Sequence, residues 1–160
     1  MPRRLVTAVC ALVVAAAAQL LYERPAAAVS CSFNTNLGAG VDFGSYDPLA
    51  GTTLTTVWTL AWTCPAGQNG YTVTMSPGNS GVQGTRWMVD SISEQLNYNL
   101  YLDPLMTTIW GDGTNGTQIL TGAASSQTAY SQNVYAKLPG KQNVTAYQSF
   151  SDYVTATLNF

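Results

Sequence analysis

The side chains that could do chemistry in this sequence are three cysteines, eight carboxylates and four tryptophans, and there is no histidine. Without histidine, a Ser-His-Asp triad, a Cys-His pair and a His-ligated metal site are all excluded. A glycosidase needs two carboxylates at a set separation, but most of these acids lie at strand ends or in turns, as Asp47 and Asp103 do. The turn that begins at Asp112 lacks the alternating acidic ligands of a calcium loop. We therefore expect no enzyme, no metal and no cofactor.

The composition excludes two further classes of protein. Charged residues make up 9% of the chain and the formal net charge is -2, so the basic surface of a nucleic-acid-binding protein is absent. Hydrophobic residues reach 46%, whereas a disordered chain combines low hydrophobicity with high net charge. A chain of this length and composition is typical of a single folded domain.

Residues 1–28 have the features of a secretory signal peptide. Two arginines precede an apolar run, Leu5–Ala18, and the small residues Ala26–Ala28 follow. Cleavage after Ala28 leaves a mature domain of residues 29–160, although a cut near Ala18 is an alternative. The apolar run of about fourteen residues is shorter than a membrane span requires, so no span is expected after cleavage.

Cys31 and Cys64 remain in the mature chain once the signal peptide is removed. In an exported protein two cysteines indicate one disulfide, here closing a loop of about 34 residues and contributing roughly 3–4 kcal/mol. Both cysteines fall on the inward register of their strands, so an inter-strand bridge is plausible. Two buried free thiols are the alternative.

Alternation of apolar and polar residues dominates the mature chain and predicts short strands separated by turns. No stretch shows the apolar stripe of an amphipathic helix, so we expect one all-β sandwich or barrel. The strands are expected at 31–43, 54–64, 71–75, 86–89, 96–102, 128–138 and 150–160.

The last expected strand carries apolar residues on one face up to the final residue, namely Val154, Ala156, Leu158 and Phe160. Either this strand is interior to the sheet, or another element completes its face and edge.

The tryptophans could stack on sugars, which makes a secreted carbohydrate-binding sandwich the alternative function. Trp58 and Trp62 share a face with Cys64, which favours core packing. Trp87 and Trp110 lie near expected loops and are the candidates for exposed adhesive aromatics.

Seven segments in order resemble the spore coat protein U domain family, which includes subunits of archaic, Csu-type chaperone–usher pili. The segments are Cys31-x-Phe33, Val41–Pro48 (VDFGSYDP), Trp62-Thr-Cys64, Leu96–Asp103 (LNYNLYLD), Ile109–Thr114 (IWGDGT), Val134–Pro139 (VYAKLP) and Ser151–Phe160 (SDYVTATLNF). Together they extend over essentially the whole mature chain.

The resemblance implies an immunoglobulin-like β-sandwich that lacks its last strand. A periplasmic chaperone would lend a strand during export, and an outer-membrane usher would be the next partner. A neighbouring pilus or coat subunit would then replace the chaperone's strand with its own. The protein would be a structural subunit of a fimbrium or cell surface, serving adhesion or biofilm formation. The groove for the partner strand would be lined by Phe33, Leu37, Val41, Val154, Ala156, Leu158 and Phe160.

Two departures from the family pattern bear on this expectation. Ala136 stands where the family often has glycine, which is a minor change. Cleavage after Ala28 leaves only Val29 and Ser30 before Cys31, too few residues for a donor strand. A pilus tip, a terminating subunit or a spore-coat-like protein fits this better than a repeating rod subunit, and pilus, coat and matrix all stay open. Cleavage near Ala18 would leave a longer extension, but one interrupted by charges and proline.

Overall fold

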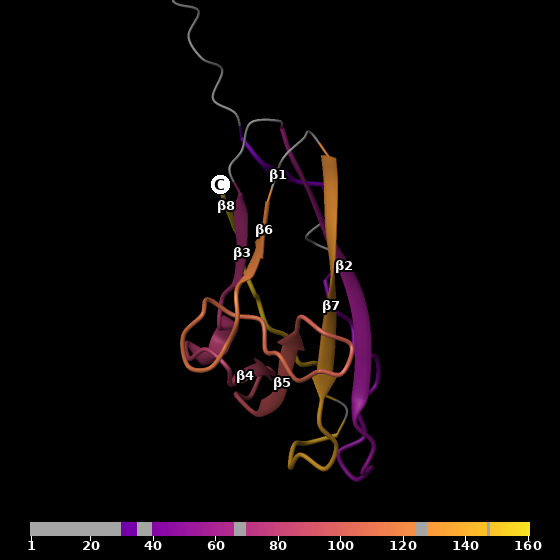
Figure 1. Cartoon of the computed structure of the whole chain (residues 1–160). Helices are drawn as coiled ribbons and strands as arrows, with labels where there is room; N and C mark the ends of the chain where they lie inside the picture. Colours follow the sequence, from indigo (N-terminus) through magenta and orange to yellow (C-terminus); the bar gives the residue numbers. More distant parts are fainter. Residues whose placement is uncertain (1–29, 35–39, 66–69, 124–127, 147) are drawn as a thin grey trace, which may run out of the picture.

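The computed structural model describes residues 30–34, 40–65, 70–123, 128–146 and 148–160. Two antiparallel sheets form the domain (Figure 1). The larger sheet has the order β1 (Ser32–Phe33), β2 (Leu54–Cys64), β7 (Thr128–Leu138), β5 (Gln95–Tyr101) and β4 (Arg86–Val89). The smaller sheet has the order β6 (Leu120–Gly122), β3 (Tyr71–Met75) and β8 (Ala156–Asn159). The expectation of an all-β sandwich is confirmed.

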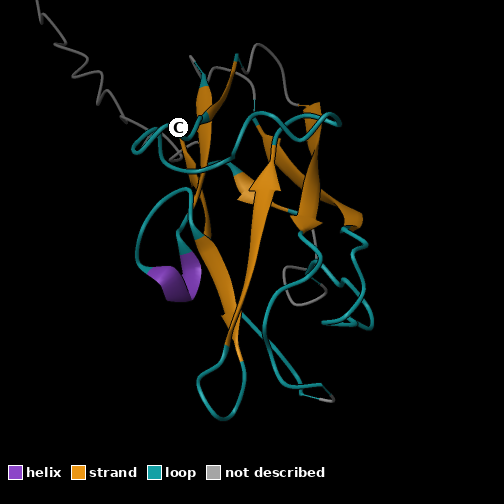
Figure 2. Ribbon diagram, turned by 90° about the horizontal axis from the view of Figure 1, so that it is seen from below, coloured by secondary structure: helices purple, strands orange, loops and turns teal. Residues whose placement is uncertain are grey.

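Helical structure is minimal in the part of the chain that the structure describes. It consists of one turn of 3-10 helix, η2 (Gly78–Ser80), drawn in purple in Figure 2. None of the described residues belongs to a helix that could cross a membrane. The expected signal peptide, residues 1–28, lies outside the described residues.

The long paired strands β2 and β7 show how the sequence builds this fold. They pair in register over eleven residues, from Leu54 opposite Leu138 to Cys64 opposite Thr128. Because successive side chains of a strand point to opposite faces, the alternation buries one face against the small sheet and leaves the other in solvent. The buried face carries Leu60, Trp62, Cys64, Val134, Ala136 and Leu138.

Two expected strands are only partly regular among the residues that the structure describes. In the range 31–43, Ser32–Phe33 form a strand, residues 35–39 lie outside the described residues, and residues 40–53 are irregular, with positive φ at Gly40 and Gly44. The strand expected over 150–160 is regular only at Ala156–Asn159. Ser151 bridges Val89 of the large sheet, whereas Ala156 already pairs with β3 of the small sheet. The intervening residues pass between sheets and cannot pair continuously with either.

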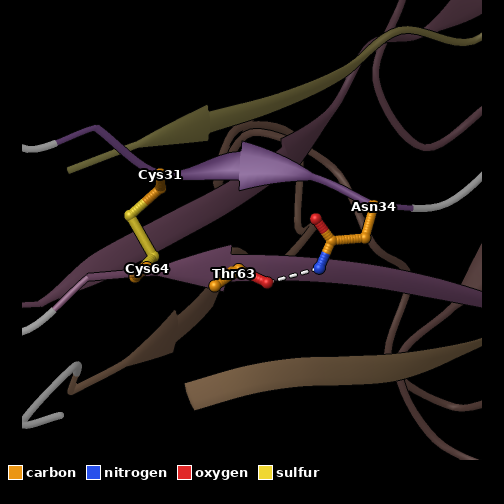
Figure 3. The surroundings of a disulfide bond; sticks show 4 residues. All are labelled: Cys31, Asn34, Thr63 and Cys64. Atoms are coloured by element: carbon orange, nitrogen blue, oxygen red, sulfur yellow. Dashed lines mark hydrogen bonds between the residues drawn. A yellow bond between two sulfur atoms is a disulfide. The ribbon is translucent and has the colours of Figure 1, made fainter. Parts of the chain in front are cut away.

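The predicted disulfide is confirmed. Cys31 and Cys64 are bonded, and both side chains are buried (Figure 3). The bridge fastens β1 beside the end of β2, with which β1 pairs over only two residues. The side chain of Asn34 also donates a hydrogen bond to Thr63. The alternative of two free thiols is therefore wrong.

Candidate functional site

A groove lies between the two sheets. A hollow of about 600 Å³ is lined by β2, β5 and β7 of the large sheet, by Met75 of β3, and by residues of the segments 40–43 and 150–156. A second hollow of about 910 Å³ continues it between residues 41–49 and 144–150. Val41, Phe43, Met88 and Phe150 line both hollows, so we treat them as one feature, the groove.

The walls of the groove are apolar but incompletely covered. Phe43, Trp58, Met88 and Val154 all pack against the hydrophobic core, yet each is only half-buried. Protein interiors are normally packed as densely as organic crystals, so a space of this size beside apolar side chains is not the interior of a finished core. Apolar groups from another molecule could fill it and gain roughly 25 cal/mol for each Å² removed from water.

Unpaired strand edges accompany the groove. Within the described residues β8 is an outer strand of the small sheet and pairs with β3, while β1 is an outer strand of the large sheet and pairs with β2. Figure 1 places both strands at the same end of the molecule. An edge strand offers a row of backbone N–H and C=O groups to any further strand. In β8, Ala156 and Leu158 are half-buried, whereas Thr157 and Asn159 are exposed.

The residues expected to line the groove fall into three groups. Val41, Val154 and Ala156 do line it. Phe33 and Leu158 instead pack half-buried against the core, and Phe160 is 54% exposed and is not among the lining residues. Leu37 lies outside the described residues.

Sequence reasoning missed much of the groove's floor. Trp58, Leu100 and Val134 come from the inward faces of three strands of the large sheet, and Met75 from β3. Their alternation identified them as inward-facing, but only the offset between the two sheets decides which inward residues meet the groove and which meet the opposite sheet.

The expectation that Trp110 is an exposed adhesive aromatic is wrong. Its side chain is fully buried, and its indole Nε1–H donates to the Val73 carbonyl at 2.9 Å. The reason is that residues 109–110 extend the large sheet, since Trp110 N donates to the Leu100 carbonyl at 2.9 Å and the glycine-rich turn begins only afterwards. Trp87, on β4, is half-buried. Trp110 therefore supplies no open aromatic platform for a sugar, whereas an adhesive role of Trp87 stays a prediction.

Two hydrogen-bonded polar side chains, those of Tyr98 and Asp152, line the groove among its apolar residues. The Tyr98 hydroxyl donates to Asp152 Oδ2 at 2.7 Å. Burial raises the pKa of the Tyr98 phenol, and the hydrogen bond and charge of Asp152 raise it further. Beside it, the guanidinium of Arg86 is fully buried and donates to the carbonyls of Ser76 and Trp110, both at 2.8 Å.

The burial of Arg86 has a cost that its hydrogen bonds offset. Burial lowers the pKa of its guanidinium, and a buried cation is tolerated only when its donors are satisfied. Two of its acceptors are the backbone carbonyls of Met75 and Ser76, where the chain leaves the small sheet. Arg86 therefore ties the two sheets together. In the sequence, this role of Arg86 could have been recognised from a single cation at an inward-facing position of a short expected strand.

The carboxylate of Asp112 accepts hydrogen bonds from within its own turn. Asp112 Oδ1 accepts hydrogen bonds from Thr114 N at 2.9 Å and Thr114 Oγ1 at 2.6 Å, and these bonds lower the pKa of Asp112. Across the described residues, no three His, Cys, Asp or Glu side chains gather in a cluster that could hold a metal ion.

Comparison with known proteins identifies a family and a fold. The family model described as Spore Coat Protein U domain matches residues 16–157. Comparison with curated proteins gives no significant match.

Two solved structures share the fold. One is the CsuC-CsuE chaperone-tip adhesion subunit pre-assembly complex from archaic chaperone-usher Csu pili of Acinetobacter baumannii, with 18% identity and a TM-score of 0.57, covering 82% of this chain and 39% of that chain. The other is a chaperone-tip adhesin complex of CFA/I fimbriae, with 8% identity and a TM-score of 0.50, covering 81% of this chain and 40% of that chain. The chain thus spans less than half the length of either matched chain.

Proposed function

The chain belongs to the Spore Coat Protein U domain family, and on that basis we propose that it is an exported structural subunit whose groove receives a strand from another protein chain. Members of this family are structural proteins rather than enzymes. The proposed assembly route is the chaperone–usher pathway, through the periplasm to a fimbrium or the cell surface.

The observation that carries this proposal is the unfilled groove beside an unpaired strand edge. A strand laid along β8 would satisfy backbone groups of that edge and direct every second side chain inward. The half-buried Val41, Val154 and Ala156 would then become interior residues. The two solved structures of similar fold are chaperone complexes of tip subunits, which is consistent with a chaperone as the first strand donor.

We place this subunit at a fibre tip or terminus, or in a spore-coat-like layer. The proposal rests on removal of residues 1–28, which leaves two residues before Cys31. Because Cys31 is bonded to Cys64, an N-terminal donor strand would have to consist of residues that precede Cys31. Such a subunit could accept a strand but not donate one. Adhesion or biofilm formation is the role we propose for the assembled structure.

Co-expression tests the assembly proposal. The mature domain is exported alone or together with a chaperone and an usher of this pathway, and the periplasmic fraction is analysed by size-exclusion chromatography. We expect aggregation or degradation of the lone domain and a stable one-to-one complex with the chaperone. A lone domain that accumulates in the periplasm as a monomer, to the same level as its chaperone complex, would refute the proposal.

N-terminal sequencing of the exported protein tests the terminal position. The expected first residue is Val29. A start near Gln19 would remove the argument for a tip or terminal subunit while leaving strand acceptance intact.

A further inference from the structure

The segment that leads into β8 is fixed at a single carboxylate. Asp152 Oδ1 accepts hydrogen bonds from the backbone N–H groups of Asn79 and Tyr153, each at 2.7 Å, and Oδ2 accepts from the Tyr98 hydroxyl at 2.7 Å. These donors come from η2, from the segment itself and from β5. One side chain therefore joins the groove wall to two separate parts of the sandwich.

The surroundings of this carboxylate leave it little freedom. Asn79 Nδ2 donates to the Ser151 carbonyl at 3.1 Å, and Ser151 exchanges two backbone hydrogen bonds of 3.0 Å with Val89. Gly78 has φ +66°, and a Cβ there would collide with the Asp152 carboxylate. The close approach of η2 to Asp152 thus requires a glycine at this turn.

We infer that Asp152 is the positioning residue of the groove, which sets the register of residues 153–156 for an incoming strand. This inference rests on the proposed function. All of residues 150–156 border the groove. With Asp152 fixed, alternation leaves Tyr153 85% exposed and keeps Val154 and Ala156 half-buried. A slip of one residue would reverse every side chain of the segment, placing the large Tyr153 ring in the groove and the apolar Val154 in solvent.

The test compares three substitutions at this contact with one control. Asp152→Ala removes all three hydrogen bonds. Asp152→Asn keeps an oxygen for the two N–H groups and offers its amide to the Tyr98 oxygen. Tyr98→Phe removes one hydrogen bond and leaves the ring in place. Asp103→Asn is the matched control, because its carboxylate also accepts backbone hydrogen bonds, from Thr107 and Thr108, but does not line the groove.

Two measurements are made on each variant of the mature, disulfide-bonded domain after it is released from the chaperone complex and kept dilute, so that it stays monomeric. Amide hydrogen exchange reports local opening of residues 153–159 against that of β2 and β7. Titration with a synthetic peptide of alternating valine and threonine, about ten residues long, reports strand acceptance.

We expect Asp152→Ala to raise exchange of residues 153–159 at least about tenfold relative to β2 and β7, and to weaken peptide binding by about tenfold, the effect of losing one or two hydrogen bonds. Asp152→Asn should restore most of both properties, Tyr98→Phe should be intermediate, and Asp103→Asn should match the wild type.

The outcomes separate the inference from the proposed function. If Asp152→Ala raises exchange equally throughout the domain, or if Tyr98→Phe and Asp152→Ala both leave exchange of residues 153–159 unchanged, Asp152 is not a positioning residue. If the wild-type domain fails to bind any strand probe while the local exchange effect is present, the proposed function is refuted and the control of register by Asp152 stands.

Discussion

Replacement of Val154 by aspartate tests directly whether the groove is a strand-binding site. Val154 lines the groove and is half-buried in the free domain. Full burial of a valine side chain is worth about 1.5–3 kcal/mol, so a half-buried valine contributes about 1 kcal/mol. We therefore expect Val154→Asp to lower the free energy of unfolding of the lone domain by only about that amount, because the carboxylate can still reach water.

The same substitution is expected to be far more damaging in the complex. A strand in the groove removes the remaining water, and a buried carboxylate without a partner costs several kcal/mol. Taking about 3 kcal/mol, at about 1.4 kcal/mol for each tenfold change in affinity, binding should weaken by more than about a hundredfold. The introduced carboxylate would have a raised pKa in the complex, so the defect should be present at neutral pH and shrink as the pH falls through that value.

The assay is titration of purified domain with its chaperone or with the alternating peptide, at neutral pH and at about pH 4. Thr157→Asp is the matched control, because it places the same charge on the exposed face of β8, opposite Thr74 of β3. If Val154→Asp binds within about threefold of wild type, or if Thr157→Asp is equally defective, the groove is not the strand-binding site.

Three further predictions concern stability. Reduction of the Cys31–Cys64 disulfide, which spans 33 residues, should lower the free energy of unfolding by about 4 kcal/mol on the loop-entropy model; thermal unfolding with and without reductant measures this, and a loss below about 1 kcal/mol would contradict it. Trp110→Phe, which leaves the Val73 carbonyl without its indole donor, should cost about 1–3 kcal/mol in denaturant unfolding with no change in the circular dichroism of the folded state; an unchanged stability would contradict the buried hydrogen bond. Because Tyr98 has a pKa raised above its usual 10.0, the folded state keeps a proton that the unfolded state loses, and stability should fall as the pH rises past 10; Tyr98→Phe should flatten this dependence in alkaline unfolding curves, and an equally steep curve would count against the buried phenol.

Alternation along the sequence located the long strands well. The expected ranges 54–64, 71–75 and 128–138 agree with β2, β3 and β7. The prediction is correct for these strands because each lies in one sheet with one face in the core. Alternation with a period of two residues therefore holds along the whole strand. The disulfide was predicted correctly from the inward register of both cysteines, since Cys31 and Cys64 are bonded beside the paired strands β1 and β2.

The errors occur where the chain passes from one sheet to the other or where a short pairing lies beside a turn. Alternation continues through residues 151–155, although Ser151 belongs to one sheet and Ala156 to the other. A pattern of side chains reports which face is inward but not which backbone is adjacent. Trp110 was misplaced because its short pairing with β5 precedes a glycine-rich turn directly. The buried Arg86 was missed because most of its acceptors are backbone carbonyls, which a sequence pattern does not reveal.

The position of the disulfide has a mechanical consequence. β1 is joined to β2 by two residue pairs, but Cys31 is bonded to the last residue of β2, and β2 in turn pairs with β7 over eleven residues. Tension applied ahead of Cys31 therefore bypasses the short first strand and passes through a covalent bond into the longest ladder of the domain. If that tension is directed along β2, it loads many hydrogen bonds in shear at once rather than opening them one after another. The bridge thus makes the beginning of the domain a point of attachment rather than a point at which the fold unravels.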